Sequence, residues 1–240
     1  MRMSRIFLIT FFILLCCTSA FCYFDEYPPY RFKDDRPKYL TLDPLVSLDK
    51  AEYKSKDGRV TARLKETSDT LDLIVQEEGK VLVKMNVKET PLPYAVYQYD
   101  IDRNGLEDFI IFYNYRGCGL AASSDKVEIY LKQNNHSYQK ISLDAMSSGL
   151  EDFVDLNKDG KYEVIVTGFY GGKDHNYFTY NIYEFSGGKL VNADLKFKGF
   201  PKFIWYTDKK NDKDTKHLSN KERAKHTEEK NSSIEYEIIK

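Results

Sequence analysis

The stretch YDIDRNGLEDFIIF, residues 99–112, decides how the rest of the chain is interpreted, and VDLNKDGKYEVIV, residues 154–166, repeats its pattern. Each has oxygen-bearing side chains at positions 1, 3, 5 and 9 of a loop and glycine at position 6. Such side chains can all point inward to calcium, which takes oxygen ligands, and glycine lets the backbone reverse. The pattern predicts two calcium loops with these side-chain ligands: Asp100, Asp102, Asn104 and Asp108, then Asp155, Asn157, Asp159 and Glu163.

A solvated turn is the alternative interpretation, because aspartate, asparagine and glycine are common turn residues. Two copies with the same positions filled, each followed by a strand-like run, favour metal binding. Acidic side chains packed this closely repel one another without a counter-ion. An EF-hand is excluded because it needs a glutamate at position 12, where the two stretches have Ile111 and Val166.

Residues 1–22 are typical of a secretory signal peptide. Arg2 and Arg5 precede an apolar run from Ile6 to Cys17, and Thr18-Ser19-Ala20 offers a small-residue cleavage site. The run is too short to span a bilayer, and a signal anchor is the alternative. We therefore expect a secreted or periplasmic protein with no membrane span after signal removal.

The rest of the chain divides by composition. Residues 23–50 are rich in proline and charge, which predicts an extended N-terminal arm rather than a helix. Residues 51–206 predict an all-β repeat domain that contains both calcium loops. Its expected strands are Arg59–Leu64, Leu71–Val75, Val81–Val87, Val96–Asp100, Asp108–Tyr115, Val127–Lys132, Tyr138–Leu143, Phe153–Leu156, Glu163–Phe169, Tyr177–Phe185 and Leu190–Phe197.

Hairpins at 77–80, 133–135 and 186–189 recur, like the loops, with a period of about 55 residues, which indicates an internal repeat. We infer three units, each a four-stranded antiparallel meander, of which the second and third carry a calcium loop. Such a unit cannot bury its faces alone, so neighbouring units must stack. The fold class we predict is a small propeller-like array, with a β-sandwich as the alternative.

The loops D-x-D-x-N-G-x-x-D and D-x-N-x-D-G-x-x-E resemble those of FG-GAP and VCBS repeats, as in the integrin α-subunit propeller. In that family the loop joins two strands of a blade and binds calcium through the side chains at positions 1, 3, 5 and 9 and the carbonyl at position 7. The resemblance therefore implies the carbonyls of Leu106 and Lys161 as further ligands. It covers roughly residues 90–200, and three units are fewer than a closed ring needs.

Residues 207–240 form a charged tail. Ser219 and Glu222 fit a capping box, which predicts a short helix near Asn220–Lys230, with disorder as the alternative. The sequence IEYEII, Ile234–Ile239, alternates like a strand and predicts pairing with an open sheet edge.

Signatures of catalysis are weak, and we expect no catalytic residue. The motifs G-x-S-x-G and H-E-x-x-H are absent from the sequence. Cys118 stays alone, pairs with Cys22 or acts as a nucleophile with His175, and we do not favour the last. Polar contexts predict surface positions for the histidines, His136, His175, His217 and His226.

The formal net charge of −1 implies no general attraction to nucleic acid. We expect a non-enzymatic, exported calcium-binding module that recognises a protein, such as an envelope enzyme that it inhibits, or a glycan. A hydrolase with a calcium-supported active site is the alternative, although the repeats leave little room for a separate catalytic domain.

Overall fold

The computed structural model describes residues 43–47, 52–55, 58–66, 69, 71–86, 92–115, 124–133, 137–146, 148–171, 176–197, 200–205 and 219–239. The chain divides into two units, Met1–Pro37 and Lys38–Lys240, and every described element belongs to the second. The predicted signal peptide, residues 1–22, and most of the predicted arm lie outside the described residues. So do Cys22, Cys118, His136, His175 and His217.

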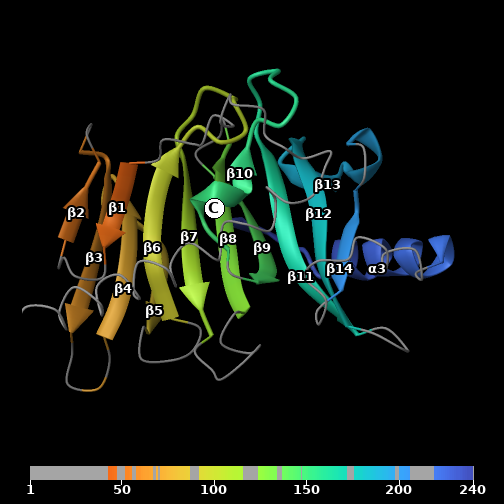
Figure 1. Cartoon of the computed structure of the whole chain (residues 1–240). Helices are drawn as coiled ribbons and strands as arrows, with labels where there is room; N and C mark the ends of the chain where they lie inside the picture. Colours follow the sequence, from red (N-terminus) through yellow and green to blue (C-terminus); the bar gives the residue numbers. More distant parts are fainter. Residues whose placement is uncertain are drawn as a thin grey trace, which may run out of the picture. The chain divides into compact units, whose positions relative to one another are not determined.

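The described strands form three antiparallel sheets (Figure 1). Sheet one has the order β2 (Glu52–Lys54), β3 (Val60–Glu66), β4 (Leu71–Glu77) and β5 (Lys80–Asn86). Sheet two has the order β1 (Asp43–Ser47), β6 (Leu92–Tyr99), β7 (Asp108–Asn114), β8 (Ser124–Lys132), β9 (Tyr138–Met146) and β15 (Glu235–Ile239). Sheet three has the order β10 (Phe153–Val154), β11 (Glu163–Gly171), β12 (Asn176–Ser186) and β13 (Lys189–Asn192), and β14 (Lys202–Trp205) also pairs with β12.

The predicted all-β class is confirmed, and the three antiparallel sheets contain the meanders β2–β5, β6–β9 and β10–β13. Two of the sheets are larger than four strands. β1 pairs with β6 and β15 pairs with β9, so sheet two is extended at both edges by strands from outside its meander. Open edges expose backbone hydrogen-bonding groups, and these added strands satisfy them. The predicted pairing of the tail with an open sheet edge is thereby confirmed.

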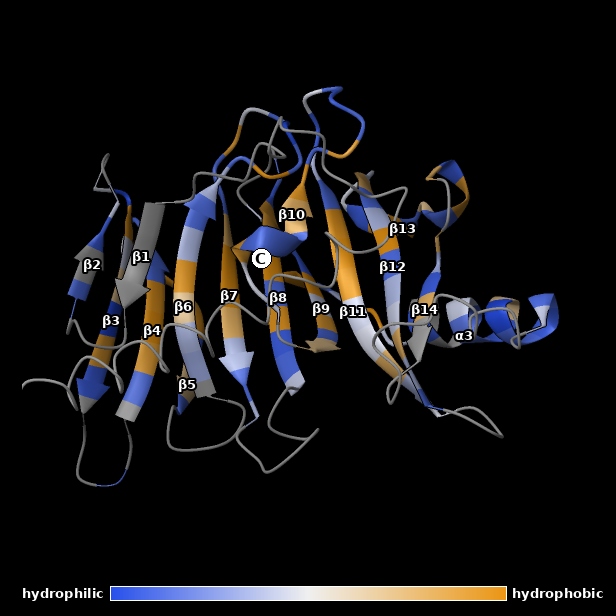
Figure 2. Ribbon diagram, in the orientation of Figure 1, coloured by the Kyte–Doolittle hydropathy of each residue, from blue (hydrophilic) through white to orange (hydrophobic). Residues whose placement is uncertain are grey.

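Sheet two is buried on both faces, as β7 illustrates. Alternate residues of a strand point to opposite faces. Ile110 and Phe112 belong to an apolar cluster shared with sheet three, whereas Phe109, Ile111 and Tyr113 belong to one shared with sheet one. Figure 2 shows β7 in orange over most of its length. The continuous apolar run therefore reflects burial between two neighbouring sheets.

The tail also contains the predicted helix, α3 (Asn220–Ser232). The capping box is present, because the Glu222 N–H donates to Ser219 Oγ at 3.2 Å and the Ser219 N–H donates to the Glu222 carboxylate at 2.8 Å. Within the described residues no helix is long and apolar enough to cross a membrane.

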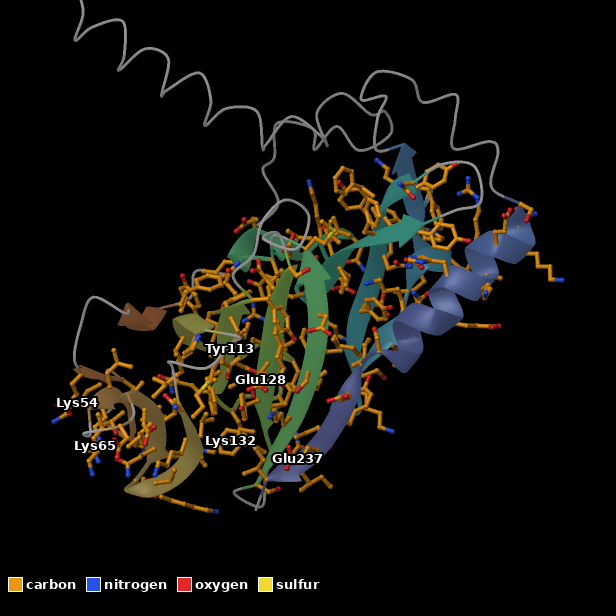
Figure 3. The ribbon with its side chains drawn as sticks, turned by 90° about the horizontal axis from the view of Figure 1, so that it is seen from below. Lys54, Lys65, Tyr113, Glu128, Lys132 and Glu237 are labelled. Carbon is orange, nitrogen blue, oxygen red and sulfur yellow. The ribbon has the colours of Figure 1, made fainter. Side chains whose placement is uncertain are left out.

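The prediction that His226 lies at the surface is wrong. Its side chain is 3% exposed. The imidazole lies against Tyr170 and Phe203, both at 5.3 Å between ring centroids, and is within hydrogen-bond distance of Asn181 Oδ1 at 3.3 Å. It attaches α3 to sheet three, beside which the helix runs in Figure 3. A polar sequence context cannot reveal such a tertiary contact.

The strand predicted at Leu190–Phe197 ends earlier, at Asn192. A short 3-10 turn, η3 (Asp194–Lys196), follows it, as η2 (Leu150–Asp152) precedes β10. The buried Asp194 carboxylate accepts hydrogen bonds from the Ile182 N–H at 2.7 Å and from Asn192 Nδ2 at 2.8 Å. The turn forms because this carboxylate satisfies the backbone that a longer strand would have paired.

Candidate metal-binding loops

Loop one, residues 100–108, connects β6 to β7. Arg103 and Gly105, at positions 4 and 6, have positive φ angles of 62° and 86°, in the left-handed region that favours glycine. This turn directs successive N–H groups at side-chain oxygens. Four hydrogen bonds result: Asn104 N to Asp102 Oδ1 at 3.1 Å, Gly105 N to Asp100 Oδ2 at 3.0 Å, Leu106 N to Asn104 Oδ1 at 2.8 Å and Ile101 N to Asp108 Oδ2 at 2.8 Å.

Loop two, residues 155–163, connects β10 to β11 and repeats this geometry. Lys158 and Gly160, again at positions 4 and 6, have φ angles of 63° and 86°. The same four hydrogen bonds are present: Asp159 N to Asn157 Oδ1 at 2.9 Å, Gly160 N to Asp155 Oδ2 at 2.9 Å, Lys161 N to Asp159 Oδ1 at 2.8 Å and Leu156 N to Glu163 Oε2 at 2.7 Å.

Every predicted side-chain ligand therefore accepts a backbone hydrogen bond from its own loop, from the amide at the same position in both. The predicted carbonyl ligands belong to Leu106 and Lys161, whose N–H groups donate to the side chain at position 5. A shared pattern of this kind fixes the oxygen atoms without depending on an ion, and it leaves further lone pairs on each carboxylate for one.

The acidic side chains of loop one converge. One carboxylate oxygen from each of Asp100, Asp102 and Asp108 lies within 4.8 Å of the others. Asp100 Oδ1 is shielded from solvent and accepts no hydrogen bond. Burial raises the pKa of Asp108 to about 8; backbone N–H donors, first that of Lys132, oppose the rise, and the charge of Asp102 adds to it. Converging oxygens with unused lone pairs are the ligand type that calcium takes.

Loop two has three acidic ligands like loop one, but differently placed, because Asn157 stands where loop one has Asp102 and Asp159 stands where it has Asn104. Of the residues that the structure describes, only the loop-one acids bring three such atoms this close together. Burial raises the pKa of Glu163 to about 7, and the charges of Asp159 and Asp155 contribute while the Leu156 N–H opposes. We therefore expect loop two to attract a cation less strongly than loop one.

Sequence reasoning missed Lys132, which supports loop one from the end of β8. Its N–H donates to Asp108 Oδ1 at 2.8 Å, and its carbonyl accepts from Asn104 Nδ2 at 3.0 Å. Its ammonium group pairs with Glu77 of sheet one, which also accepts from the Tyr138 hydroxyl at 2.8 Å. Antiparallel pairing of the predicted strands places the end of β8 beside the start of β7, a signal that could have identified Lys132.

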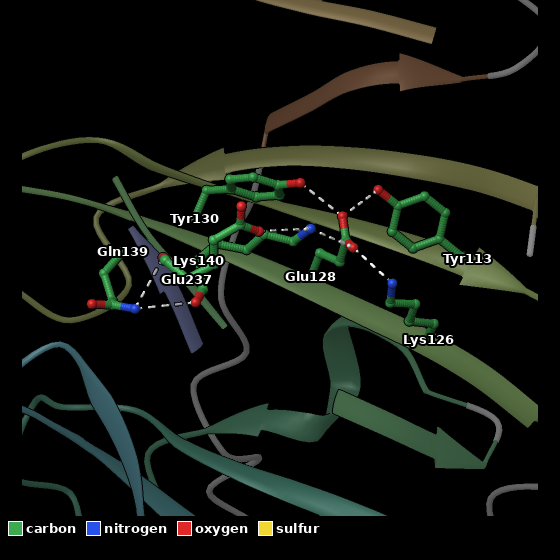
Figure 4. Close-up of polar contacts among 7 residues, drawn as sticks. All are labelled: Tyr113, Lys126, Glu128, Tyr130, Gln139, Lys140 and Glu237. Atoms are coloured by element: carbon green, nitrogen blue, oxygen red, sulfur yellow. Dashed lines mark hydrogen bonds and ion pairs between the residues drawn. The ribbon is translucent and has the colours of Figure 1, made fainter. Parts of the chain in front are cut away.

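A second polar cluster lies on the face of sheet two that meets sheet one, around Glu128 (Figures 3 and 4). The Tyr113 and Tyr130 hydroxyls each donate to its carboxylate at 2.7 Å, and Lys126 and Lys140 lie at 2.9 and 3.0 Å. Burial would raise the pKa of Glu128, but these partners outweigh it and hold the pKa at about 2. Both oxygens are satisfied within the chain, so this carboxylate supports packing.

Comparison with known proteins adds no family. The likeness to FG-GAP and VCBS repeats rests on the loop residues quoted above. No family model matches the chain, and no curated protein or solved structure matches it either.

Proposed function

We propose that the chain is an exported calcium-binding β-protein that acts as a non-enzymatic interaction module. The observation that carries the proposal is the hydrogen-bond pattern common to the two loops, which holds oxygen side chains at the same four positions. A solvated turn gives no reason to repeat this pattern around carboxylates that repel one another. Ligands that are all oxygen, on a flexible loop, suit calcium among the common divalent ions.

The calcium has a structural role in this proposal. Loop one joins β6 to β7 and contacts β8 through Lys132, so an ion there stabilises three strands of sheet two together. Loop two joins β10 to β11 of sheet three. The packing of sheet two between sheets one and three supports a propeller-like stack. An ion at about ten times its Kd contributes about 1.4 kcal/mol per site.

The stacked sheets present the contact surface in this proposal. Exposed aliphatic side chains favour a protein partner over a glycan: Leu195 is 97% exposed, Ile238 63% and Val191 50%. Removing aliphatic side chains that are exposed to this extent from water, as a partner protein would, is favourable in free energy. A protein partner is therefore the form of the proposal that we prefer.

The hydrolase alternative receives less support. A pocket of about 310 Å³ lies between sheets two and three and α3, where it is lined by residues that include Asp144, Thr167 and Lys230. None of the predicted calcium ligands lines it. A calcium-supported hydrolase needs its substrate beside the ion, and this pocket does not provide that arrangement.

A thermal melt in excess chelator and in about 2 mM calcium tests the proposal, since extracellular modules bind calcium in that range. We expect calcium to raise the Tm by about 8 °C, because two occupied sites contribute about 2.8 kcal/mol and each kcal/mol shifts the Tm of a domain of this size by about 2–4 °C. The double variant Asp100→Ala/Asp155→Ala should lose this rise. An unchanged Tm for the wild-type chain would show that the loops are solvated turns.

A further inference from the structure

Arg103 of loop one reaches across to loop two. Its Nε donates to the Gly160 carbonyl at 3.2 Å, and its Nη2 donates to the Tyr162 hydroxyl at 3.1 Å. The guanidinium carbon lies 4.9 Å from the centroid of the Tyr162 ring and 5.2 Å from that of Tyr99. The two rings also contact each other edge to face, with centroids 6.1 Å apart. A cation held by two hydrogen bonds and two aromatic faces is well positioned.

Both ends of this bridge are next to predicted ligands. Arg103 stands between Asp102 and Asn104 in loop one, with its backbone at the left-handed position that forms the turn. Gly160 stands between Asp159 and Lys161 in loop two, and its own N–H donates to Asp155 Oδ2 at 2.9 Å. Any change in the turn of one loop therefore moves the bridge, and the bridge moves the backbone that aims ligands in the other.

The two tyrosines that contact Arg103 are also next to predicted ligands. Tyr99 directly precedes Asp100, the first ligand of loop one, and Tyr162 directly precedes Glu163, the last ligand of loop two. The Arg103 guanidinium thus contacts the chain at the entry to one loop and at the exit from the other. These contacts connect the turns of both loops, so an ordering of either turn can act on the other through the Arg103 side chain.

We propose that the Arg103 bridge couples the two loops, so that a cation bound in one raises the affinity of the other. The inference rests on the proposed calcium binding and adds its regulation. Binding at one loop fixes its turn, and the second loop then loses less conformational freedom when it binds. Direct repulsion between the two ions acts in the opposite direction, so the sign of the measured coupling is decisive.

Calorimetric titration of the full chain with calcium chloride tests the coupling. We expect a wild-type Hill coefficient clearly above 1, and about tenfold tighter binding at each loop when the other is filled. Asp159→Ala removes loop two and Asp102→Ala removes loop one, so each variant gives the affinity of the remaining loop alone. Linkage requires that both comparisons give the same factor.

Arg103→Ala should reduce the Hill coefficient to about 1 and leave each loop with the affinity of the corresponding single-loop variant. Arg103→Lys keeps the charge but loses the planar two-donor geometry, so it should also reduce the Hill coefficient to about 1. Tyr162→Phe, which removes the hydroxyl that accepts from Arg103, should reduce only in part the factor by which filling one loop tightens binding at the other. Lys158→Ala, the matched control, removes a charge from position 4 of loop two and should preserve cooperativity.

The outcomes separate the two proposals. Two ions that bind the wild-type chain independently would overturn the coupling and leave calcium binding intact. Cooperativity retained in both Arg103→Ala and Arg103→Lys would assign the coupling to other contacts and overturn the role of Arg103. An absence of heat and of any melting shift with calcium would overturn the proposed function together with this inference.

Discussion

Two buried carboxylates of sheet two are held in opposite ways. Glu128 in β8 contacts two lysine ammonium groups, at 2.9 and 3.0 Å. Asp108, at the start of β7, accepts hydrogen bonds from the backbone amides of Ile101 and Lys132. Within the described part of the chain, no lysine or arginine forms an ion pair with Asp108.

The difference concerns where the compensating charge comes from. A buried charge is costly unless it is paired. For Glu128 the chain supplies the cations, on the same sheet. Lys132, whose backbone N–H donates to Asp108, directs its ammonium group to Glu77 instead. Loop one has a cation of its own in Arg103, but its guanidinium is directed at Gly160 and Tyr162 of loop two. The proposed calcium would supply the charge that its acidic side chains lack.

The largest effect that we expect comes from Glu128→Ala. The substitution leaves two buried tyrosine hydroxyls and the half-buried Lys126 without their acceptor, and leaves Lys140 with Glu237 at 3.8 Å. It should reduce the free energy of unfolding by about 4 kcal/mol. Urea unfolding measures it. Glu128→Gln, which retains an acceptor oxygen, should cost less. A loss below about 1 kcal/mol for Glu128→Ala would show that the cluster is not a closed ion-pair network.

Low pH should remove the stability that the ionised Glu128 carboxylate contributes. The pKa of Glu128 is depressed, against the effect of burial, by Lys126, Tyr113, Tyr130 and Lys140, from 4.5 to about 2. A depressed carboxyl pKa adds stability above the unfolded value, and this stability is lost as the pH falls from about 4.5 through about 2. About 3 kcal/mol is at stake. Urea unfolding at several pH values should show that the difference between wild type and Glu128→Gln vanishes in acid; a constant difference would contradict the pairing.

Glu77→Gln tests whether the ion pair between Lys132 of sheet two and Glu77 of sheet one contributes to stability. The two side chains are only 14% and 13% exposed, so loss of the carboxylate charge should reduce stability by about 2 kcal/mol. Glu184→Gln is the matched control, because its partner Lys196 is 65% exposed and surface pairs contribute below about 1 kcal/mol. Equal melting shifts for the two variants would show that Glu77 and Lys132 act as a surface pair.

Sequence pattern predicted what depends on neighbours in the chain. The apolar runs located every strand of the three meanders except β2, and Ser219 with Glu222 located α3, because strand periodicity and helix capping are local properties. The loop residues were likewise found from spacing, since their hydrogen bonds join residues at most seven apart, as between Leu156 and Glu163.

What the sequence did not predict depends on contacts between distant residues. Arg103 and Tyr162 are 59 residues apart, and Lys132 is 55 from Glu77. His226 was misplaced because the aromatic surface that buries it comes from β11 and β14. The added strand β1 follows the same principle, since an edge takes whichever segment the fold brings beside it, whereas the pairing of β15 was predicted from its alternating pattern.

The smallest effect that we expect comes from exchanging one charge between the loops. Asp102→Asn gives loop one the amide that loop two has at Asn157, and Asn157→Asp does the reverse. Because calcium affinity follows the number of ligand charges, each change should alter the Kd of its loop by up to about tenfold, weaker for Asp102→Asn and tighter for Asn157→Asp. In chelator the two variants should change the stability in the opposite directions. Asp102→Asn should then stabilise the chain by roughly a few tenths of 1 kcal/mol, because it relieves the repulsion between residue 102 and Asp100. Melts with and without calcium measure both signs; shifts in the same direction under both conditions would mean that the acids act through the turn and not through an ion.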